Sequence, residues 1–347
     1  MNTPLQTFTR LACAFSLLAA SASQAQVTAV GMRQIQSNGM PITLVYPTAA
    51  AAQDVTYGAF TVQIASNAAP LPAAPSAASD KRGLIVLSHG TAGSALPDHA
   101  LAATLARAGF VVAQPEHRGD NWQDFSRAGP ESWKTRPQDV SDTIDAVARD
   151  PVLAGAQWRM LNLVKHCAQH QSEDIGFCLN GLAGQPWPQL LRKTQFFMAR
   201  VLTESNAPDS MKMLNGGHSP VPAESSRDPR PDPRIAAVSL AVPVGAIFTA
   251  ESLSRIRIPL GLTTAGQDGV LVPRFHSQHV LLHCTSCTTL SDHPQAGHFD
   301  WLSPWPTSVA QTVAAAQMRG GLPNTTFSDA ERQKAFDQIT LFFKQKL

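Results

Sequence analysis

Two loops of the sequence carry an acid and a base that can act together. Asp268 lies just after an apolar run that ends at Gly266, and His298 stands in a loop after the last predicted strand. An imidazole that is oriented by a carboxylate can activate a serine or cysteine nucleophile and then protonate the leaving group. The two residues therefore indicate nucleophilic catalysis.

A third segment offers the electrophilic part of such a site. Residues 86–94 read Val-Leu-Ser-His-Gly-Thr-Ala-Gly-Ser, which is a buried strand running into a glycine-rich turn and then a helix. Glycines let a backbone approach a ligand closely, and the amides after the strand can point at a developing oxyanion. We expect an oxyanion-binding turn here.

The elements that would position these residues alternate between strands and helices. Apolar runs predict strands, and amphipathic runs predict helices at 98–108 and 138–149. The predicted strands cover residues 84–87, 111–113, 235–242, 256–263 and 288–290. Asn38-Gly39 predicts a hairpin within residues 27–47, and the box Ser328-Asp-Ala-Glu331 predicts the start of a last helix. The alternation implies a mostly parallel sheet with helices on both faces.

The helix at 138–149 has one apolar face, made by Val140, Ile144 and Val147. Its three aspartates, at 139, 142 and 145, are expected to point elsewhere.

Two regions do not follow the alternating pattern. Residues 67–82 are rich in Ala, Pro and Ser and predict a surface loop. Residues 156–234 predict a small helical cap and a mobile loop, with helices near 155–168 and 188–203.

Together the three chemical segments resemble the α/β-hydrolase superfamily, and most closely its exported dienelactone-hydrolase-like esterases. The order of oxyanion turn, acid and base along the chain matches that family, and the resemblance covers most of residues 30–347. It implies a single α/β-hydrolase domain at 26–347, a carboxylic ester or lactone as small-molecule substrate, and no cofactor. It also implies that Asp268 is the triad acid and His298 the base, with Gly90 and Thr91 at the oxyanion site.

The departure from the family lies at the nucleophile. The chain holds no Gly-x-Ser-x-Gly or Gly-x-Cys-x-Gly motif. In the family pattern a strand, a tight turn and a helix follow the helix at 138–149, whereas here residues 150–158 run directly into the cap-like segment. We interpret this as an internal deletion of roughly 20 to 30 residues, which leaves the fold one strand-turn-helix short. Weak or absent activity is the expected result.

Two residues are alternative nucleophiles. Ser219 lies in Gly217-His-Ser-Pro-Val221, where Pro and Val replace the small residues of the strained turn. Cys167 lies in Lys165-His-Cys-Ala-Gln169, where Lys and Gln replace the glycines. An active esterase using either residue, or a non-enzymatic binding protein on the hydrolase scaffold, remains an alternative to an inactive hydrolase.

The N-terminus predicts export. Residues 1–25 contain one charge, Arg10, then an apolar region, then Ser23-Gln-Ala25, which is the pattern of a signal peptide cleaved before Gln26. We expect a periplasmic or secreted protein. Its four remaining cysteines would suit disulfides, with Cys167–Cys178 as one pair. Cys284 and Cys287 could form a second bridge or stay unpaired, and a redox pair is the alternative.

Composition excludes several other classes. A net charge of +2 leaves no cationic excess for nucleic acid, and no apolar run outside the N-terminus reaches the ~20 residues of a membrane span. His276, His279 and His283 recur at helical spacing near Cys284, so a zinc site is an alternative for this segment. We predict no metal, because no acidic residue lies among them.

Overall fold

A computed structural model describes most of the chain outside one long internal segment. The described residues are 29–57, 60–65, 81–91, 93–124, 126–128, 130–151, 153, 157–164, 232–315 and 326–346. The predicted signal peptide, the helix expected near 188–203 and nearly all of the expected loop at 67–82 lie outside these residues.

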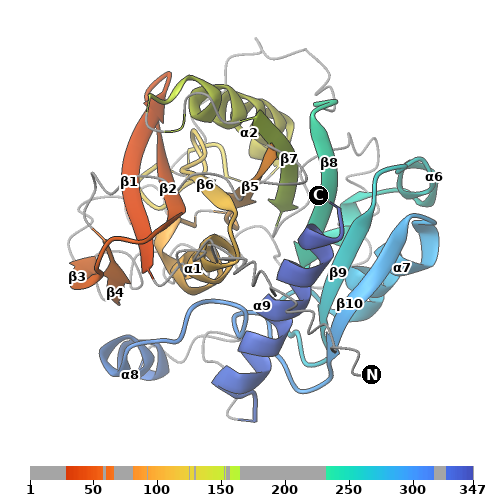
Figure 1. The fold of residues 1–347 in the computed structure, drawn as a ribbon. Helices are drawn as coiled ribbons and strands as arrows, with labels where there is room; N and C mark the ends of the chain where they lie inside the picture. The colour runs from red at the N-terminus through yellow and green to blue at the C-terminus, as the bar shows by residue number, and fades with distance from the viewer. Residues whose placement is uncertain are drawn as a thin grey trace, which may run out of the picture.

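The described residues form an eight-stranded sheet in the order β1-β2-β6-β5-β7-β8-β9-β10 (Figure 1). From β6 to β10 all neighbouring strands are parallel, while β1 and β2 join the edge as an antiparallel pair. The strands are β1 Ala29–Ser37, β2 Met40–Thr48, β5 Lys81–Ser88, β6 Val111–Pro115, β7 Gln157–Val164, β8 Ile235–Ala241, β9 Leu260–Ala265 and β10 Cys287–His293. The prediction of a mostly parallel sheet is confirmed.

The opening hairpin forms as the Asn-Gly pair predicted. Ser37 pairs with Met40, and the two turn residues, Asn38 and Gly39, have φ angles of 49° and 78°. Such left-handed backbone at both central positions matches the twist of a two-residue hairpin, and Asn and Gly tolerate it best. A second, separate hairpin of β3 Gln53–Tyr57 and β4 Phe60–Ile64 was not predicted.

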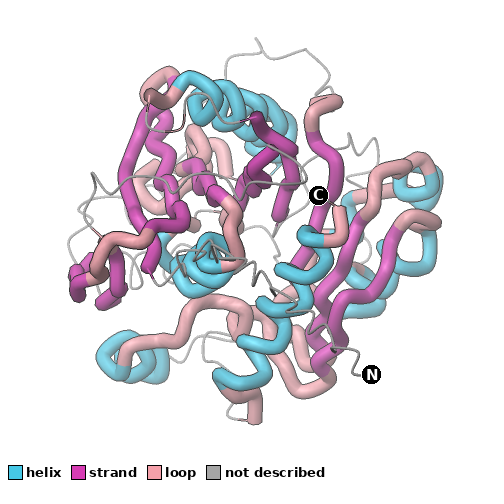
Figure 2. The backbone as a smooth tube through the Cα atoms, viewed as in Figure 1, coloured by secondary structure: helices cyan, strands magenta, loops and turns pink. Residues whose placement is uncertain are grey.

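Helices cover both faces of the sheet (Figure 2). The helices are α1 His99–Arg107, α2 Pro130–Arg149, α6 Ala250–Ser254, α7 Ser277–His283, α8 Thr307–Ala315 and α9 Asp329–Lys344, with short 3-10 turns at Leu96–Asp98, Gly245–Ile247 and Pro273–Phe275. One hydrophobic cluster joins α2, α6 and α7 to one face, and another joins α1, α8, α9 and β4 to the opposite face. None of these described helices combines the length and the apolar character that crossing a bilayer requires.

The ends of several elements follow local chemistry. The hydroxyl of Ser328 accepts a hydrogen bond from the amide of Glu331 at 3.2 Å and caps α9, as its sequence predicted. Alternation of residues on β5 sends Leu84 and Val86 toward α2, and Ile85 and Leu87 toward α1.

The expected loss of a central strand is wrong. Residues 157–164, which we expected to be helical, form β7, a parallel strand between β5 and β8. Gln157, Arg159 and Asn162 interrupt its apolar residues, so the segment does not read as the continuous apolar run typical of a buried parallel strand. The tight turn and helix that would follow β7, and most of the expected cap, lie outside the described residues.

Candidate active site

The predicted acid and base lie side by side at the carboxyl edge of the sheet. Asp268 follows β9 and His298 follows β10, and these neighbouring parallel strands deliver their loops to the same edge. The Nδ1 atom of His298 lies 2.9 Å from Oδ2 of Asp268, and both side chains are buried. The structure thus brings the two residues together, and their catalytic roles stay predictions.

The carboxylate of Asp268 is held in one orientation by its own loop. Its Oδ1 accepts hydrogen bonds from the amides of Val270 at 2.8 Å and Leu271 at 2.7 Å, which leaves Oδ2 to the imidazole. Because Nδ1 of His298 donates to a carboxylate, the neutral ring carries its lone pair on Nε2. That nitrogen is the basic atom of the pair.

Backbone contacts hold the two loops against each other. The amide of Gly266 donates to the carbonyl of His293 at 3.0 Å, and the amide of Gln267 donates to the carbonyl of Ala296 at 2.9 Å. A side chain at 266 would place its Cβ 2.5 Å from the carbonyl oxygen of Pro294, so only glycine allows this approach.

A second histidine lies close to the pair. His276 is buried, and its pKa falls to about 4, first because burial penalises the charged ring and then because His298 repels it, against an opposing effect of Asp268. His276 is therefore neutral near pH 7, when it adds no positive charge beside His298.

The predicted oxyanion turn follows β5. Gly90 is partly exposed and Thr91 is buried, and the amide of Gly93 donates to the carbonyl of Gly90 at 3.0 Å to close the turn. A Cβ at 93 would lie 2.9 Å from that same oxygen, which explains the glycine at this position. The turn is thus tightly folded against itself.

Sequence reasoning missed a buried polar chain behind this turn. The hydroxyl of Ser88 lies 2.7 Å from Nε2 of His117, and Nδ1 of His117 lies 3.1 Å from Oδ2 of Asp139. Asp139, which we expected to point away from the apolar face of its helix, is 1% exposed and binds His117 and Arg118. In the sequence, His117 lies in a polar loop at 114–121, just after the strand predicted at 111–113.

The structure does not identify a nucleophile. The candidates Cys167 and Ser219 lie outside the described residues, as does Cys178, so the predicted pair Cys167–Cys178 stays a prediction. The last residue of β7, Val164, pairs with Ser88 at the edge where the oxyanion turn begins.

Near α7, both cysteines and one histidine contact other groups of the protein. Cys284 and Cys287 form a disulfide. The Nε2 atom of His279 lies 2.8 Å from the carbonyl oxygen of Phe248, and its ring contacts the ring of His283 edge to face. Within the described ranges, no three His, Cys, Asp or Glu side chains are grouped as a metal ion would need.

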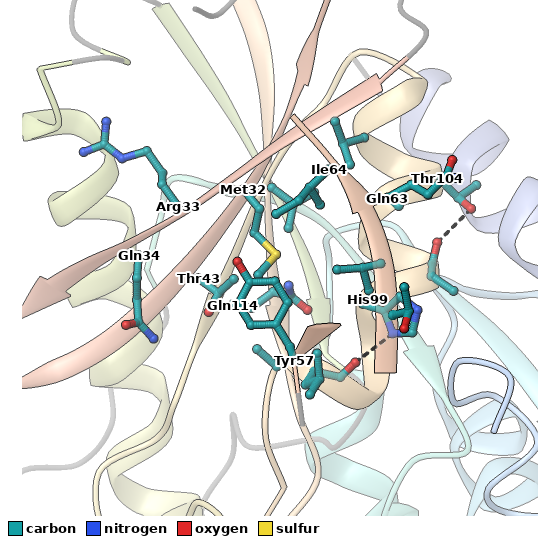
Figure 3. A pocket seen from close by; sticks show the side chains of 18 of the residues that line it. Met32, Arg33, Gln34, Thr43, Tyr57, Gln63, Ile64, His99, Thr104 and Gln114 are labelled. Carbon is teal, nitrogen blue, oxygen red and sulfur yellow. Dashed lines mark hydrogen bonds between the residues drawn. The ribbon is translucent and has the colours of Figure 1, made fainter. Parts of the chain in front are cut away.

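A cavity of about 690 Å³ lies apart from the acid and base, on the α1 face of the sheet (Figure 3). The β3–β4 hairpin and α1 form its walls over strands β1, β2 and β6, and the lining includes Met32, Thr43, Tyr57, Ile64, His99 and Gln114. The candidate acid, base and oxyanion residues are not part of this lining, so the cavity is distinct from the candidate active site.

Comparison with known families gives one match. The family model described as platelet-activating factor acetylhydrolase, isoform II, matches residues 37–126, a span that contains the oxyanion turn but is less than half of the chain. A sequence comparison with curated proteins gives no match.

Many solved structures are similar to this chain, and three of them are described here. The chain is similar to the ferulic acid esterase from Streptomyces cinnamoneus, with a TM-score of 0.55 and 16% identity over 95% of this chain and 92% of the other. A CIB-like hydrolase from Thermoplasma acidophilum has a TM-score of 0.36 and 11% identity over 77% and 89%. A cold-adapted esterase from an Arctic intertidal metagenomic library has a TM-score of 0.41 and 10% identity over 91% and 93%.

The eight-stranded sheet and the first of these structures show that the fold is of the α/β-hydrolase type, and the family model that matches residues 37–126 is consistent with this fold. The narrower resemblance to dienelactone hydrolases stays a prediction, because none of these matches names that group.

Proposed function

We propose that the protein is an exported carboxylic-ester hydrolase of low catalytic efficiency. The observation that carries this proposal is the buried contact of 2.9 Å between His298 and Asp268 at the same sheet edge as the turn of Gly90 and Thr91. The names of the matched family and of the first structure, an acetylhydrolase and a ferulic acid esterase, both denote action on carboxylic esters, and they support the same substrate class.

The chemistry proposed for this site is general-base hydrolysis. His298 takes a proton from water at Nε2 while the water oxygen bonds to the ester carbonyl carbon, and Asp268 stabilises the resulting imidazolium. The carbonyl oxygen becomes an oxyanion, which the turn amides bind. Collapse of the intermediate breaks the bond to the alcohol, which leaves with the proton from Nε2. The low efficiency follows from the absence of a nucleophile motif in the sequence.

The decisive experiment is hydrolysis of p-nitrophenyl acetate by the wild-type protein and by His298→Ala, combined with labelling by a fluorophosphonate and by iodoacetamide. We expect slow turnover without an initial burst, loss of that turnover in His298→Ala, and no labelled serine or cysteine at a stoichiometric level.

Two other outcomes would replace this proposal. A burst with labelling at Cys167 or Ser219, abolished by Cys167→Ser or Ser219→Ala, would establish covalent catalysis by that residue. Equal hydrolysis by the wild type and His298→Ala would remove the esterase proposal and favour a binding protein on this scaffold.

Export is proposed from the N-terminal sequence, with support from the Cys284–Cys287 disulfide, which suits an oxidising compartment. Expression of the full chain in a bacterium with a periplasm, followed by N-terminal sequencing of the periplasmic fraction, tests it. We expect the mature protein to begin at Gln26, and recovery of only uncleaved cytoplasmic protein would contradict export.

A further inference from the structure

One arginine is buried directly behind the oxyanion turn. Arg136, on α2, is 1% exposed, and it pairs with the fully buried Asp120, whose Oδ2 lies 2.8 Å from Nη2 and 3.1 Å from Nε. Burial of a charged pair is costly unless further hydrogen bonds satisfy the remaining protons. The remaining partners of this guanidinium therefore indicate what its burial achieves.

Apart from the backbone carbonyl of Asp120, which lies 3.4 Å from Nη2, those partners are two successive backbone carbonyls of the turn. Nη1 donates to the carbonyl of His89 at 2.6 Å, and Nη2 donates to the carbonyl of Gly90 at 3.1 Å. In extended backbone, successive carbonyls point to opposite sides. Here one planar group with fixed donors holds both of them on the same side.

The orientation of the carbonyls fixes that of the amides. In a trans peptide the N–H points opposite to the C=O of the same unit, and the structure has no cis peptide among its described residues. The N–H groups of Gly90 and Thr91 therefore both point away from Arg136. Within the described part of the chain, neither amide donates to another residue.

We propose that Arg136 is a positioning residue that turns the amides of Gly90 and Thr91 into a two-donor site for an oxyanion. This inference rests on the proposed function and deepens it. Successive amides on one side of the backbone form an anion-binding concavity. Both donors then come from a single loop, so the site does not require an amide from a residue after a nucleophile.

A histidine adds to the same arrangement. The amide of His117 donates to Nε2 of His89 at 3.3 Å, so the proton of the neutral ring is on Nδ1, which donates to the carbonyl of Gly90 at 2.6 Å. Burial holds the pKa of His89 well below its ordinary value, and the charge of Arg136 lowers it further. His89 therefore keeps this neutral form, and the Gly90 carbonyl has three donors that face it.

Arg136→Lys separates positioning from simple charge balance. Lysine keeps the positive charge beside Asp120, but a single ammonium does not reproduce the planar pair of donors that reaches two carbonyls. The double variant Arg136→Met with Asp120→Asn removes the ion pair together with the clamp, so it leaves no unpaired buried charge. Arg118→Met is the matched control, because Arg118 is a neighbouring arginine that binds Asp139 and Asp142 of α2 and contacts no turn carbonyl.

The first readout is binding of dimethylphosphinate, a tetrahedral anion, followed through the ¹H–¹⁵N signals of Gly90 and Thr91. We expect both signals to shift on titration of the wild type, with affinity lowered about 10-fold or more in Arg136→Lys and in the double variant. Arg118→Met should bind as the wild type does. Equal affinity in Arg136→Lys, or shifts that avoid both amides, would overturn the inference.

The second readout is hydrolysis of p-nitrophenyl acetate. A misplaced oxyanion donor acts on the transition state, so kcat should fall roughly 10- to 100-fold in Arg136→Lys while KM changes less than about 3-fold. If the wild type binds phosphinate at these amides but shows no hydrolysis that depends on His298, the proposed function fails while the anion site stands. If kcat falls no further than in Arg118→Met, Arg136 is only a structural partner of Asp120.

Discussion

The hydroxyl of Ser88 and the imidazole of His117 are in hydrogen-bond contact at 2.7 Å, and Asp139 binds the other ring nitrogen. This is the connectivity of a serine-hydrolase triad. All three side chains are buried, on the face of the sheet that α2 covers. Burial and the charges of Arg136 and Arg118 hold the pKa of His117 well below its ordinary value, which opposes formation of the imidazolium that a catalytic base must become.

We therefore predict that Ser88 is structural. A fluorophosphonate should leave Ser88 unlabelled, and Ser88→Ala should lower the free energy of unfolding by about 1 to 2 kcal/mol, because Nε2 of His117 loses a buried donor. Denaturant melts measure this loss. Ser252→Ala, which removes a surface hydroxyl contact, is the control and should change stability by less than about 0.5 kcal/mol. Labelling of Ser88 would show that the triad-like chain is a working site.

Asp268→Asn should lower hydrolysis of p-nitrophenyl acetate without unfolding the protein. The amide removes the charge that stabilises imidazolium at His298 and disfavours the tautomer with its lone pair on Nε2, so kcat should fall roughly 10²- to 10⁴-fold. Steady-state kinetics beside a thermal melt measure both effects. An activity within about 3-fold of the wild type would show that the 2.9 Å contact is not used in the reaction.

Gly266→Ala should impair activity because it would push apart the loops that follow β9 and β10. The new Cβ would lie 2.5 Å from the carbonyl oxygen of Pro294, which is backbone and can move only with the loop that leads to His298. We expect kcat to fall at least 10-fold, since small displacements of reacting groups are costly. Gly269→Ala is the control, because its Cβ would have no neighbour within 4 Å. Equal activity in both variants would show that the loops adjust freely.

Glu116 should make the fold less stable as the pH rises. Its Oε1 accepts a hydrogen bond from the amide of Ala95 at 2.9 Å. Its buried Oε2 lies 3.7 Å from Nε2 of His89 and has no hydrogen-bond partner among the described residues. Burial raises the pKa of Glu116 from 4.5 to about 7, so the folded protein retains a proton that the unfolded chain loses earlier. The stabilising contribution is complete below the unfolded pKa and disappears as the pH rises through about 7.

The measurement is a series of thermal melts of wild type and Glu116→Gln between pH 5 and pH 8. The glutamine variant should gain on the order of 1 to 3 kcal/mol relative to the wild type across this range, because it does not ionise. Glu251→Gln, at an exposed glutamate, should show no such trend. A constant difference between wild type and Glu116→Gln would mean that Glu116 stays ionised in the folded protein.

Loss of the Cys284–Cys287 disulfide should cost a modest amount of stability. The bridge closes a loop with a sequence separation of 3, and so short a loop constrains the unfolded chain by only about 2 kcal/mol. Denaturant melts of Cys284→Ser with Cys287→Ser measure the loss. Peptide mass spectrometry of the exported wild type should find both thiols oxidised, and free thiols there would contradict the bridge.

The sequence predicted the elements whose information is local. Asn38-Gly39 specified the turn of the first hairpin, and the apolar run before Ser88 specified β5. The proximity of Asp268 and His298 was also predictable, because each follows its strand by only a few residues. The network of Ser88, His117 and Asp139 was not, since its members come from three segments that meet only in the folded sheet.

Strand β7 and Arg136 escaped prediction for related reasons. The polar residues of β7 interrupt the apolar run by which a buried strand is recognised in sequence. Its place in the sheet is evident only from its pairing with β5, which runs from Lys81 opposite Gln157 to Ser88 opposite Val164. In the sequence, Arg136 looks like any charged residue of a helix. Its proposed role depends on the carbonyls of Gly90 and His89, which lie 46 and 47 residues earlier in the chain. Both are properties of long-range packing, which local periodicity does not encode.

The strand order has a mechanical consequence. The proposed oxyanion donors follow β5, whereas the proposed acid and base follow β9 and β10, and within the sheet these halves are joined through β7 and β8. The pairing of β7 is uneven. Eight successive residues of β7 pair with β5, whereas its register shifts where it pairs with β8. A shift of β7 along β8 would change the distance between the two halves of the site, while the contacts within each half would stay the same.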